Sequence, residues 1–432
     1  MIRGLLMLAL VQAPLAAQDT MPVVTLEEAL RASVQLDPDY VRAVGQLENA
    51  EWGRRAALLV FLLPTVTASA DYSEFSSSQF NVGIGSAANA SGRYSLDARY
   101  EIFAGGRKLA ASRQASAELE AASAGELGLR FLSALETERD YYEVLGQREL
   151  LDVARQREQR AREQFALARA RVQGGATVQS DSLQVLLELQ RAETAVLNRD
   201  AALTVARLQL GRRVGSGGPV DAAALTDAPP GTLPIGLDEA VQLAVSQGPA
   251  WRQARANERA SDAVLRGSRG SYFPTIALTG AFTTNDNKFF PTATTRRAVG
   301  INLSWPIWNG GQRELAIERA ESNRDVARAV REDLERSARR DVTEAFTSYQ
   351  VANRTQEIAI AAVAVATEIL RVQQARYQAG ASTVLELLDA QSQLVQAQAD
   401  LVQSRYDVRL ARASLEAILG RRLISDSTAS VP

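Results

Sequence analysis

The stretch RYSLDARYEIFAGG, residues 93–106, alternates apolar and polar side chains over its first ten positions and ends in two glycines. Its even-numbered residues from Tyr94 to Ile102 are apolar, and its odd-numbered residues from Arg93 to Glu101 are polar. Successive side chains of a strand point to opposite faces, so this period of two predicts a strand with one apolar face and one water-facing face. A strand of about ten residues is long enough to cross a bilayer at a tilt.

Three further stretches alternate in the same way, at residues 65–72, 275–283 and 299–307. They predict two hairpins with strands of about nine to eleven residues. The polar segments 73–92 and 284–296 are predicted to be extracellular loops. Aromatic side chains near the strand ends match the girdles of outer-membrane barrels. These predicted membrane-interface residues are Tyr72, Tyr100, Phe103, Phe273, Trp305 and Trp308.

A pair of hairpins packed on a soluble core would show the same alternation. Four strands cannot close a barrel, because about eight are the practical minimum. An open sheet edge cannot lie in lipid either. If the strands lie in a membrane, several chains must therefore share one barrel, and three copies would give twelve strands.

Two stretches without proline predict very long helices, from Arg107 to Val172 and from Gln312 to Gln378. Each is about 66 residues, or roughly 100 Å of helix. They are expected to turn back at Gly174-Gly175 and at Ala379-Gly380, because glycine readily adopts the left-handed conformation of a helix end. The returning helices carry apolar residues every seven positions, which predicts left-handed coiled-coil packing. These residues are Leu387, Leu394, Leu401, Val408 and Leu415, echoed by Leu189, Val196, Leu203 and Leu210.

The chain is duplicated. Five short motifs recur in the same order about two hundred residues apart, and the last of them is Leu-Gly-Arg-Arg, at residues 210–213 and 419–422. A Gly/Pro-rich linker at residues 215–234 separates the two predicted repeats. The first repeat is assigned to residues 18–214 and the second to residues 235–423, and a polar tail occupies residues 424–432. Each repeat is predicted to contain one helix, two strands, a very long helix, a turn and a second long helix.

The N-terminus has the three parts of a secretory signal peptide, predicted for residues 1–17. Arg3 precedes an apolar stretch, and Ala16-Ala17 supplies the small residues of a cleavage site. No later run of 18 consecutive apolar residues occurs, so membrane contact through the strands is expected.

Composition excludes several function classes. The 48 Lys and Arg residues against 50 Asp and Glu residues give a net charge of −2, which argues against a nucleic-acid partner. The chain has no Cys and no His, which excludes thiol nucleophiles, histidine general bases and Cys/His metal sites. Long Ala-rich coiled coils offer no concave pocket for a carboxylate pair, so no enzyme activity, cofactor or metal is expected.

The duplicated layout resembles the TolC-like outer-membrane efflux protein family. The resemblance rests on the motif LEEA at residues 26–29 with its echo LDEA at 237–240, on the strand exits FAGG and WNGG, and on the turn AGASTVLELLDA at 379–390. It implies a mainly α fold with a small β part: a homotrimer whose twelve-stranded outer-membrane barrel continues into a long α-helical periplasmic tube. Such a tube would be the passive exit duct of a tripartite pump, joined through a periplasmic adaptor protein to an inner-membrane transporter.

The resemblance also implies site residues at the periplasmic tip. A pore gate of acidic rings falls on Glu386 and Asp389, which lie three residues apart and share one helical face. Acidic residues near a helix N-terminus also simply complement the helix dipole. The family's acidic latch position falls on Asp181, and its basic partner falls on Ser382, which cannot form an ion pair.

Two more residues belong to this possible closing network: Tyr377 matches a family tyrosine, and Arg376 could replace the missing base. The turns at Gly174, Gly175 and Gly380 would be the places where adaptor hairpins dock, although ordinary helix C-caps would explain these glycines as well.

The alternative from another class is a structural or adhesive periplasmic coiled-coil protein without channel activity. The sequence does not identify the cargo, the adaptor or the transporter.

Overall fold

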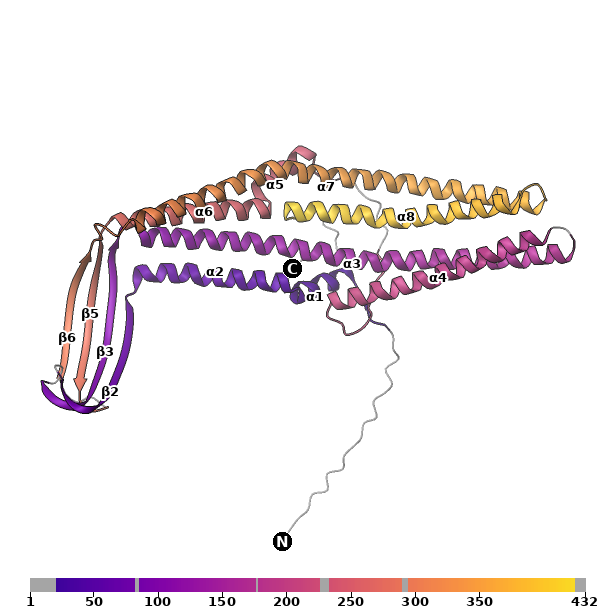
Figure 1. Cartoon of the computed structure of the whole chain (residues 1–432). Coiled ribbons are helices and arrows are strands. Elements are labelled where there is room, and N and C mark those ends of the chain that lie inside the picture. Colours follow the sequence, from indigo (N-terminus) through magenta and orange to yellow (C-terminus); the bar gives the residue numbers. More distant parts are fainter. Residues whose placement is uncertain (1–20, 82–84, 176–177, 226–232, 290–293, 424–432) are drawn as a thin grey trace, which may run out of the picture.

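The structure is a computed structural model that describes residues 21–81, 85–175, 178–225, 233–289 and 294–423. It is mainly helical with a small β part, as predicted. The four main strands lie at one end of the molecule, and two long helical hairpins extend to the other end (Figure 1). The predicted signal peptide and the polar tail lie outside the described residues.

The two halves of the chain present their main elements in the same order. The first half contains α1 (Leu26–Leu36), α2 (Pro38–Leu62), β2 (Thr65–Asn81), β3 (Ser86–Ala104), α3 (Arg107–Gln173) and α4 (Gln179–Arg213). The second half contains α5 (Leu237–Gln247), α6 (Pro249–Arg269), β5 (Thr275–Asp286), β6 (Thr294–Ser304), α7 (Gln312–Gln378) and α8 (Val384–Leu419). Short pieces complete the described chain: β1 (Val23–Val24), β4 (Asp221–Ala222) and a 3₁₀ turn at Gly270–Tyr272.

Each half has two helices before its strands instead of the one that was predicted. The break follows from proline, which lacks the backbone N–H that a continuing helix needs. Pro38 and Pro249 each lie in the first turn of the second helix, where that N–H would have no partner anyway. Asp37 caps α2 by accepting the Asp39 backbone N–H at 2.9 Å.

The sheet is antiparallel with the strand order β2-β3-β5-β6. Its register brings the apolar positions of all four strands onto one face. One such row runs across Val66, Ala98, Gly280 and Val299. The predicted alternation is therefore confirmed through most of the sheet, which has one apolar face and one polar face. It stops at a register shift between Glu101 and Phe103, and β6 ends at Ser304, so residues 305–307 of the predicted strand lie outside it.

The prediction of a long loop at residues 73–92 was wrong. β2 and β3 continue through most of this segment as a paired ladder, with a register shift between Glu74 and Gln79. Pairing satisfies backbone N–H and C=O groups whatever the side chains are, so small polar residues extend a hairpin as well as apolar ones. In the other hairpin, β5 reaches Asp286 and β6 begins at Thr294, so the two ends of the predicted loop 284–296 are also strand.

The helices repeat the order of the strands. α2 and α4 pack along α3, α3 packs against α6 and α8, and these two pack along α7. The C-terminal end of α8 meets the start of α6, where a Cβ on Gly420 would lie 2.5 Å from Pro249 Cγ. The helical layer therefore has two edges: α2 with α4 at one side and α7 at the other (Figure 1).

The long helices and their heptad positions are confirmed. α3 and α7 each contain 67 residues, or roughly 100 Å. Leu387 and Leu394 are buried against α7, and Leu189 and Leu203 are buried against α3. Each returning helix thus uses its seven-residue repeat to pack on the long helix before it.

A second, outer layer covers the helices about halfway along. α1 packs on α3 and α4, and α5 packs on α7 and α8. The parallel pair β1–β4 closes over Tyr141, whose hydroxyl donates to the carbonyl of Ala223 at 2.8 Å. Residues Asp221 and Ala222 of this pair belong to the segment that was predicted to be a linker.

The last arginine of each Leu-Gly-Arg-Arg motif fastens its helix to α3. Arg213 Nε lies 3.0 Å from Asp140 Oδ2. Arg422 Nη1 lies 2.7 Å from Glu138 and 2.7 Å from Glu416, both almost fully buried. Burial raises the pKa of Glu138, and Arg422 opposes that rise.

Within the described residues, one helix has the length and composition to cross a membrane. α7 contains an 18-residue window with a mean hydropathy of 1.4, of which only 17% is buried. Its exposed apolar residues include Val351, Ile358, Val365 and Val372, spaced at seven-residue intervals. That spacing is typical of a coiled-coil seam that faces another helix.

Candidate functional site

The two helical hairpins end in glycine turns at the tip that lies farthest from the sheet (Figure 1). Gly175 and Gly380 both adopt positive φ, at 72° and 74°. The second turn is a Schellman motif, in which Ala381 N–H donates to Arg376 O at 2.8 Å and Gly380 N–H donates to Tyr377 O at 3.1 Å. Gly174, Gly175 and Gly380 are exposed at this tip.

Glu386 and Asp389 lie in the first turns of α8, directly after the second hairpin turn. Both are exposed, on the face opposite the buried Leu387. Thr383 caps the helix by accepting the Glu386 backbone N–H at 3.3 Å. The Glu386 carboxylate accepts a hydrogen bond from the hydroxyl of Ser382 at 2.7 Å. Ser382, at the family's basic position, thus contacts a predicted gate residue.

A hydrogen-bonded contact between the two hairpin tips involves an arginine that was not assigned to the site from the sequence. Arg171 of α3 donates to the carbonyls of Tyr377 and Gln378 at 3.2 and 3.1 Å, and its guanidinium lies 4.9 Å from the centre of the Tyr377 ring. Arg376 instead donates to Ala381 O at 3.3 Å within its own turn. Asp181 lies in the first turn of α4 and is partly buried.

Tyr377 also joins the apolar cores of both hairpins. Its ring packs against the cluster that contains Leu387 and against a second cluster, formed by Ala168 of α3, Val185 of α4 and Val384 of α8. The structure therefore brings Tyr377 together with α3 and α4 through both packing and hydrogen bonds.

A polar stripe continues from Glu386 and Asp389, the predicted gate residues, along α8. Amide side chains donate to carboxylates one turn away, Gln393 to Asp389 at 2.7 Å, and Gln396 to Asp400 and Gln403 to Asp407 at 2.8 Å each. The alternating spacing of four and three residues keeps the stripe on one helical face. In sequence order it consists of Glu386, Asp389, Gln393, Gln396, Asp400, Gln403 and Asp407.

The handedness of the sheet decides which way this stripe faces. Thr275 and Thr279 lie on the polar face of β5 and donate to the carbonyls of Ser304 and Gly300 on β6, at 3.3 and 3.2 Å. When an L-residue on an upward strand points its side chain at the viewer, its carbonyl and N–H point right. Viewed from the polar face with the sheet above the helices, β5 runs upward and the side chains of Thr275 and Thr279 point at the viewer. The backbone groups of these residues therefore point right, toward β6, and the order β2-β3-β5-β6 runs from left to right.

The helices keep that order, so their faces can be assigned too. α8 runs toward the sheet and packs on α3 through Val384 and on α7 through Leu387. Because the α-helix is right-handed, Glu386 and Asp389 lie on the face that continues the polar face of the sheet. The outer layer of α1 and α5 lies on the other side, which continues the apolar face of the sheet.

Most of the predicted interface aromatics lie where strands meet helices. The hydroxyl of Tyr100 donates to Phe61 O at 2.7 Å, and Trp305 Nε1 donates to Tyr272 O at 3.1 Å. Phe103, Phe273 and Trp308 lie in the same junctions and are exposed. Tyr72 is far from them along the sheet and makes an edge contact with Phe289, with ring centres 5.5 Å apart.

The spacing of the two aromatic levels fits a bilayer. One end of β5, Thr275, lies beside the level of Trp305. The other end, Asp286, lies at the level of Tyr72, because Asp286 pairs with Gly92 and Gly92 pairs with Tyr72. The 12 residues of β5 span about 36 Å, or about 26–30 Å of height at a strand tilt of 35–45°. The apolar band of outer-membrane barrels is about 25 Å tall.

Among the described residues, no group of three or more His, Cys, Asp and Glu residues is arranged to hold a metal ion. The candidate site therefore consists of the hairpin tip, the polar stripe of α8 and the two-faced sheet.

The chain is similar to proteins of the bacterial outer membrane. A sequence model of the family described as "Outer membrane efflux protein" matches residues 35–216 and 240–421. Outer membrane protein OprJ of Pseudomonas aeruginosa is 28% identical over 293 residues, which are 65% of this chain and 59% of that protein. Protein CyaE of Bordetella pertussis is 26% identical over 302 residues, 68% of this chain and 63% of that protein. The chain thus spans about three fifths of the length of these relatives.

A solved structure shares the fold over nearly the whole chain. A membrane protein from Pseudomonas aeruginosa matches with a TM-score of 0.79 at 21% identity, over 95% of this chain and 93% of that one.

Proposed function

Because this chain belongs to the outer membrane efflux protein family, we propose that three copies of it form a passive exit duct across the outer membrane. In this proposal an inner-membrane transporter and a periplasmic adaptor protein deliver the cargo, and the duct performs no chemistry. The observation that carries the proposal is the pair of unpartnered edges, which a head-to-tail ring of copies would cover.

The sheet supports a shared barrel. β2 and β6 are its edge strands, and the apolar face of β6 is openly exposed, with Val299 at 83% and Ile301 at 73%. Lipid can surround such a face, but it cannot satisfy the free backbone groups of an edge strand. Pairing β2 of one copy with β6 of the next removes every edge, and three copies give a barrel of twelve strands.

The helical edges support the same ring. On α4 an exposed seam follows the coiled-coil spacing through Leu183, Leu187 and Leu197, separate from the buried seam that faces α3. On α7 the exposed heptad residues from Val351 to Val372 lie on the edge away from α6 and α8. The order of the helices brings α7 of one copy against α4 of the next, and both apolar seams would then be buried.

We place the gate at Glu386 and Asp389. Their face of α8 continues the polar face of the sheet, which would line the duct. Three copies would bring six carboxylates to the tip and concentrate cations there. The stripe above them adds Asp400 and Asp407, so the lining above the gate would also attract cations.

The closing network is assigned to the contact between the two hairpins of one copy. In this proposal Arg171 and Tyr377, which contact each other, form the network, and Asp181 of α4 is its acidic member, whereas Arg376 bonds within its own turn. The exposed turns at Gly174, Gly175 and Gly380 would receive the adaptor, and the junction aromatics would lie among the outer-membrane lipid headgroups.

The number of copies is the first test of this proposal. Detergent-corrected mass measurement on the purified full-length protein should give three chains per particle. Purified particles that are folded but contain one chain each would overturn the shared barrel and leave the coiled-coil alternative.

A further inference from the structure

A groove between α6 and α7 lies between the sheet and the outer layer and takes no part in the proposed duct. Its volume is about 690 Å³. Five arginines, three carboxylates and Trp251 line it. The arginines Arg324 and Arg331 lie 12 and 19 residues after the start of α7 at Gln312, which places the groove about 18–29 Å from the sheet.

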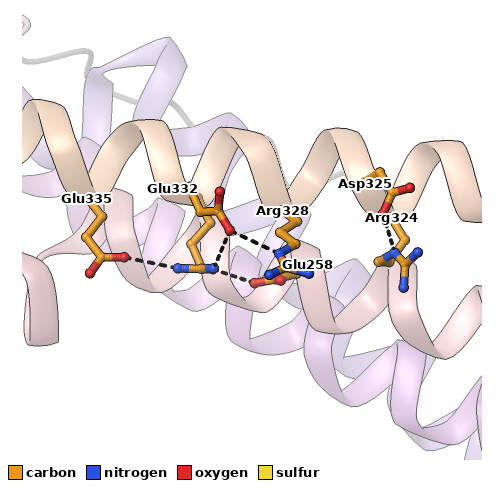
Figure 2. A network of polar contacts seen from close by, with 7 residues as sticks. Glu258, Arg324, Asp325, Arg328, Glu332 and Glu335 are labelled. Atoms are coloured by element: carbon orange, nitrogen blue, oxygen red, sulfur yellow. Dashed lines mark hydrogen bonds and ion pairs between the residues drawn. The ribbon is translucent and has the colours of Figure 1, made fainter.

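An ion-pair network fixes the α7 wall of the groove (Figure 2). Arg331 Nε lies 2.6 Å from Glu258 Oε2 of α6, and Nη1 lies 3.1 Å from Glu335. Arg328 Nε pairs with Glu332 at 3.0 Å. Figure 2 shows these side chains following one another along α7, with Glu258 reaching them from the neighbouring helix. The wall is therefore held rigidly before any partner binds.

One arginine on the α6 wall of the groove has no such partner among the described residues. The Arg255 guanidinium lies 5.1 Å from the centre of the Trp251 ring, and it forms no ion pair with any residue that the structure describes. Arg328 retains 61% side-chain exposure despite its ion pair. Binding donors are thus available on both walls.

The groove opens on the side of the outer layer. A neighbouring depression shares Trp251 and Arg255 with Ser246 and Gln247 at the end of α5. The exposed seam of α7, where the next copy would pack, is a different face of that helix. In the proposed duct the groove therefore faces the periplasm, once in each copy around the tube.

We propose that this groove binds a carboxylate-bearing glycan of the cell wall. An indole ring offers a flat apolar surface for a sugar ring. Arg255 and Arg328 offer planar donors that match carboxylates. Glu258, Asp262 and Glu335 can accept hydrogen bonds from sugar hydroxyl or amide groups. Such carboxylates would repel a purely acidic peptide, which therefore fits this mixed lining less well.

Repetition would strengthen the interaction. Three equivalent grooves on one duct can engage one polymer at the same time, so weak binding at each groove becomes firm attachment. The duct would then be anchored to the wall that it passes through.

Co-sedimentation with purified peptidoglycan sacculi tests this proposal. The purified full-length trimer in detergent should pellet with sacculi, and the double variant Arg255→Gln with Arg328→Gln should bind them at least about tenfold more weakly. Arg336→Gln is the matched control, because Arg336 is an exposed arginine of α7 that does not line the groove. Equal binding by the double variant and the wild type would overturn the proposal.

A second measurement uses Trp251 itself. Soluble muropeptides should change the tryptophan fluorescence of the wild type and should not change that of Trp251→Phe. Displacement of bound sacculi by polyglutamate, but not by muropeptides, would assign the groove to an acidic peptide instead. The outward orientation of the groove depends on the proposed duct, so particle mass is measured on the same samples. Trimers that do not bind sacculi would contradict only the proposal that the groove binds a glycan. Monomers would contradict the proposed trimeric duct.

Discussion

The guanidinium of Arg171 lies 4.9 Å from the centre of the Tyr377 ring and donates hydrogen bonds to the carbonyls of Tyr377 and Gln378. These carbonyls belong to the last turn of α7, where no N–H of the helix pairs with them, and Tyr377 O also accepts the Gly380 N–H of the turn. A positive charge at a helix C-terminus is also favoured by the helix dipole. One arginine of the first hairpin thus holds the tip of the second.

Arg171→Ala should therefore favour the open tip. The two hydrogen bonds come from a charged but partly exposed donor, so their loss should cost about 1–2 kcal/mol. If the closed state depends on them, the open fraction should rise about five- to thirtyfold, measured as open probability in a planar bilayer. Arg376→Ala is the control, because Arg376 bonds within its own turn. An unchanged open probability in Arg171→Ala would remove this contact from the closing network.

The exposed seam of α7 predicts a sharp contrast between two isoleucines. Ile358 lies on the seam with an exposure of 57%, and Ile360 lies two residues further, on another face, with an exposure of 55%. Ile358→Glu should abolish the trimer, because a coiled-coil seam does not tolerate a buried unpaired charge. Ile360→Glu should leave it intact. Particle mass in detergent distinguishes the two outcomes, and trimers from both variants would argue against this seam.

The buried carboxylate of Glu138 predicts a pH dependence of stability. Burial raises its pKa above the ordinary value of 4.5, against the opposing effect of Arg422. The stability that this group contributes is therefore complete below pH 4.5 and is lost as the pH rises through the raised pKa. Glu138→Gln cannot titrate, so its melting temperature relative to the wild type should increase by about 2–4 °C between pH 4.5 and pH 8.

Asp37 serves as the control, because its contribution to stability depends on pH in the opposite direction. Burial alone would raise the pKa of Asp37, but the backbone N–H groups at the start of α2 and the nearby Arg213 lower it below the ordinary 3.8. Its contribution is present above pH 3.8 and is lost as the pH falls through the lowered pKa. Asp37→Asn should thus be destabilised relative to the wild type at neutral pH and less so in acid. Parallel pH profiles for the two variants would contradict the assignment of Glu138.

Local periodicity explains which parts of the fold could be predicted from the sequence. The alternation around Leu96 indicates a strand with one apolar face, and the heptads around Leu394 indicate a helix with a buried face. Each pattern lies within one element, so neighbouring residues are sufficient to predict that element. The break before Pro249 could also have been found, because proline favours the first turn of a helix. The extension of β2 and β3 could not, since backbone pairing depends little on the identity of small polar side chains.

Contacts between distant segments could not be predicted from the sequence. Arg171 and Arg376 both lie near a predicted turn, and only the packing of the hairpins brings Arg171 to Tyr377. The α6–α7 groove likewise joins Glu258 to Arg331 across 73 residues of sequence. Neither residue belongs to a recognisable motif, because the pairing arises from the order of helices in the layer.

The central claim is a duct whose narrowest point carries the carboxylates of Glu386 and Asp389. Single-channel recording in a planar bilayer, with wild type compared with Glu386→Gln plus Asp389→Asn, tests it most directly. We expect a cation-preferring conductance in the wild type, and weaker cation preference and weaker block by multivalent cations in the double variant. Asp407→Asn, far along the stripe from the tip, should leave that block nearly unchanged. Folded wild-type trimers without any conductance, under conditions in which Arg171→Ala also fails to conduct, would contradict the duct.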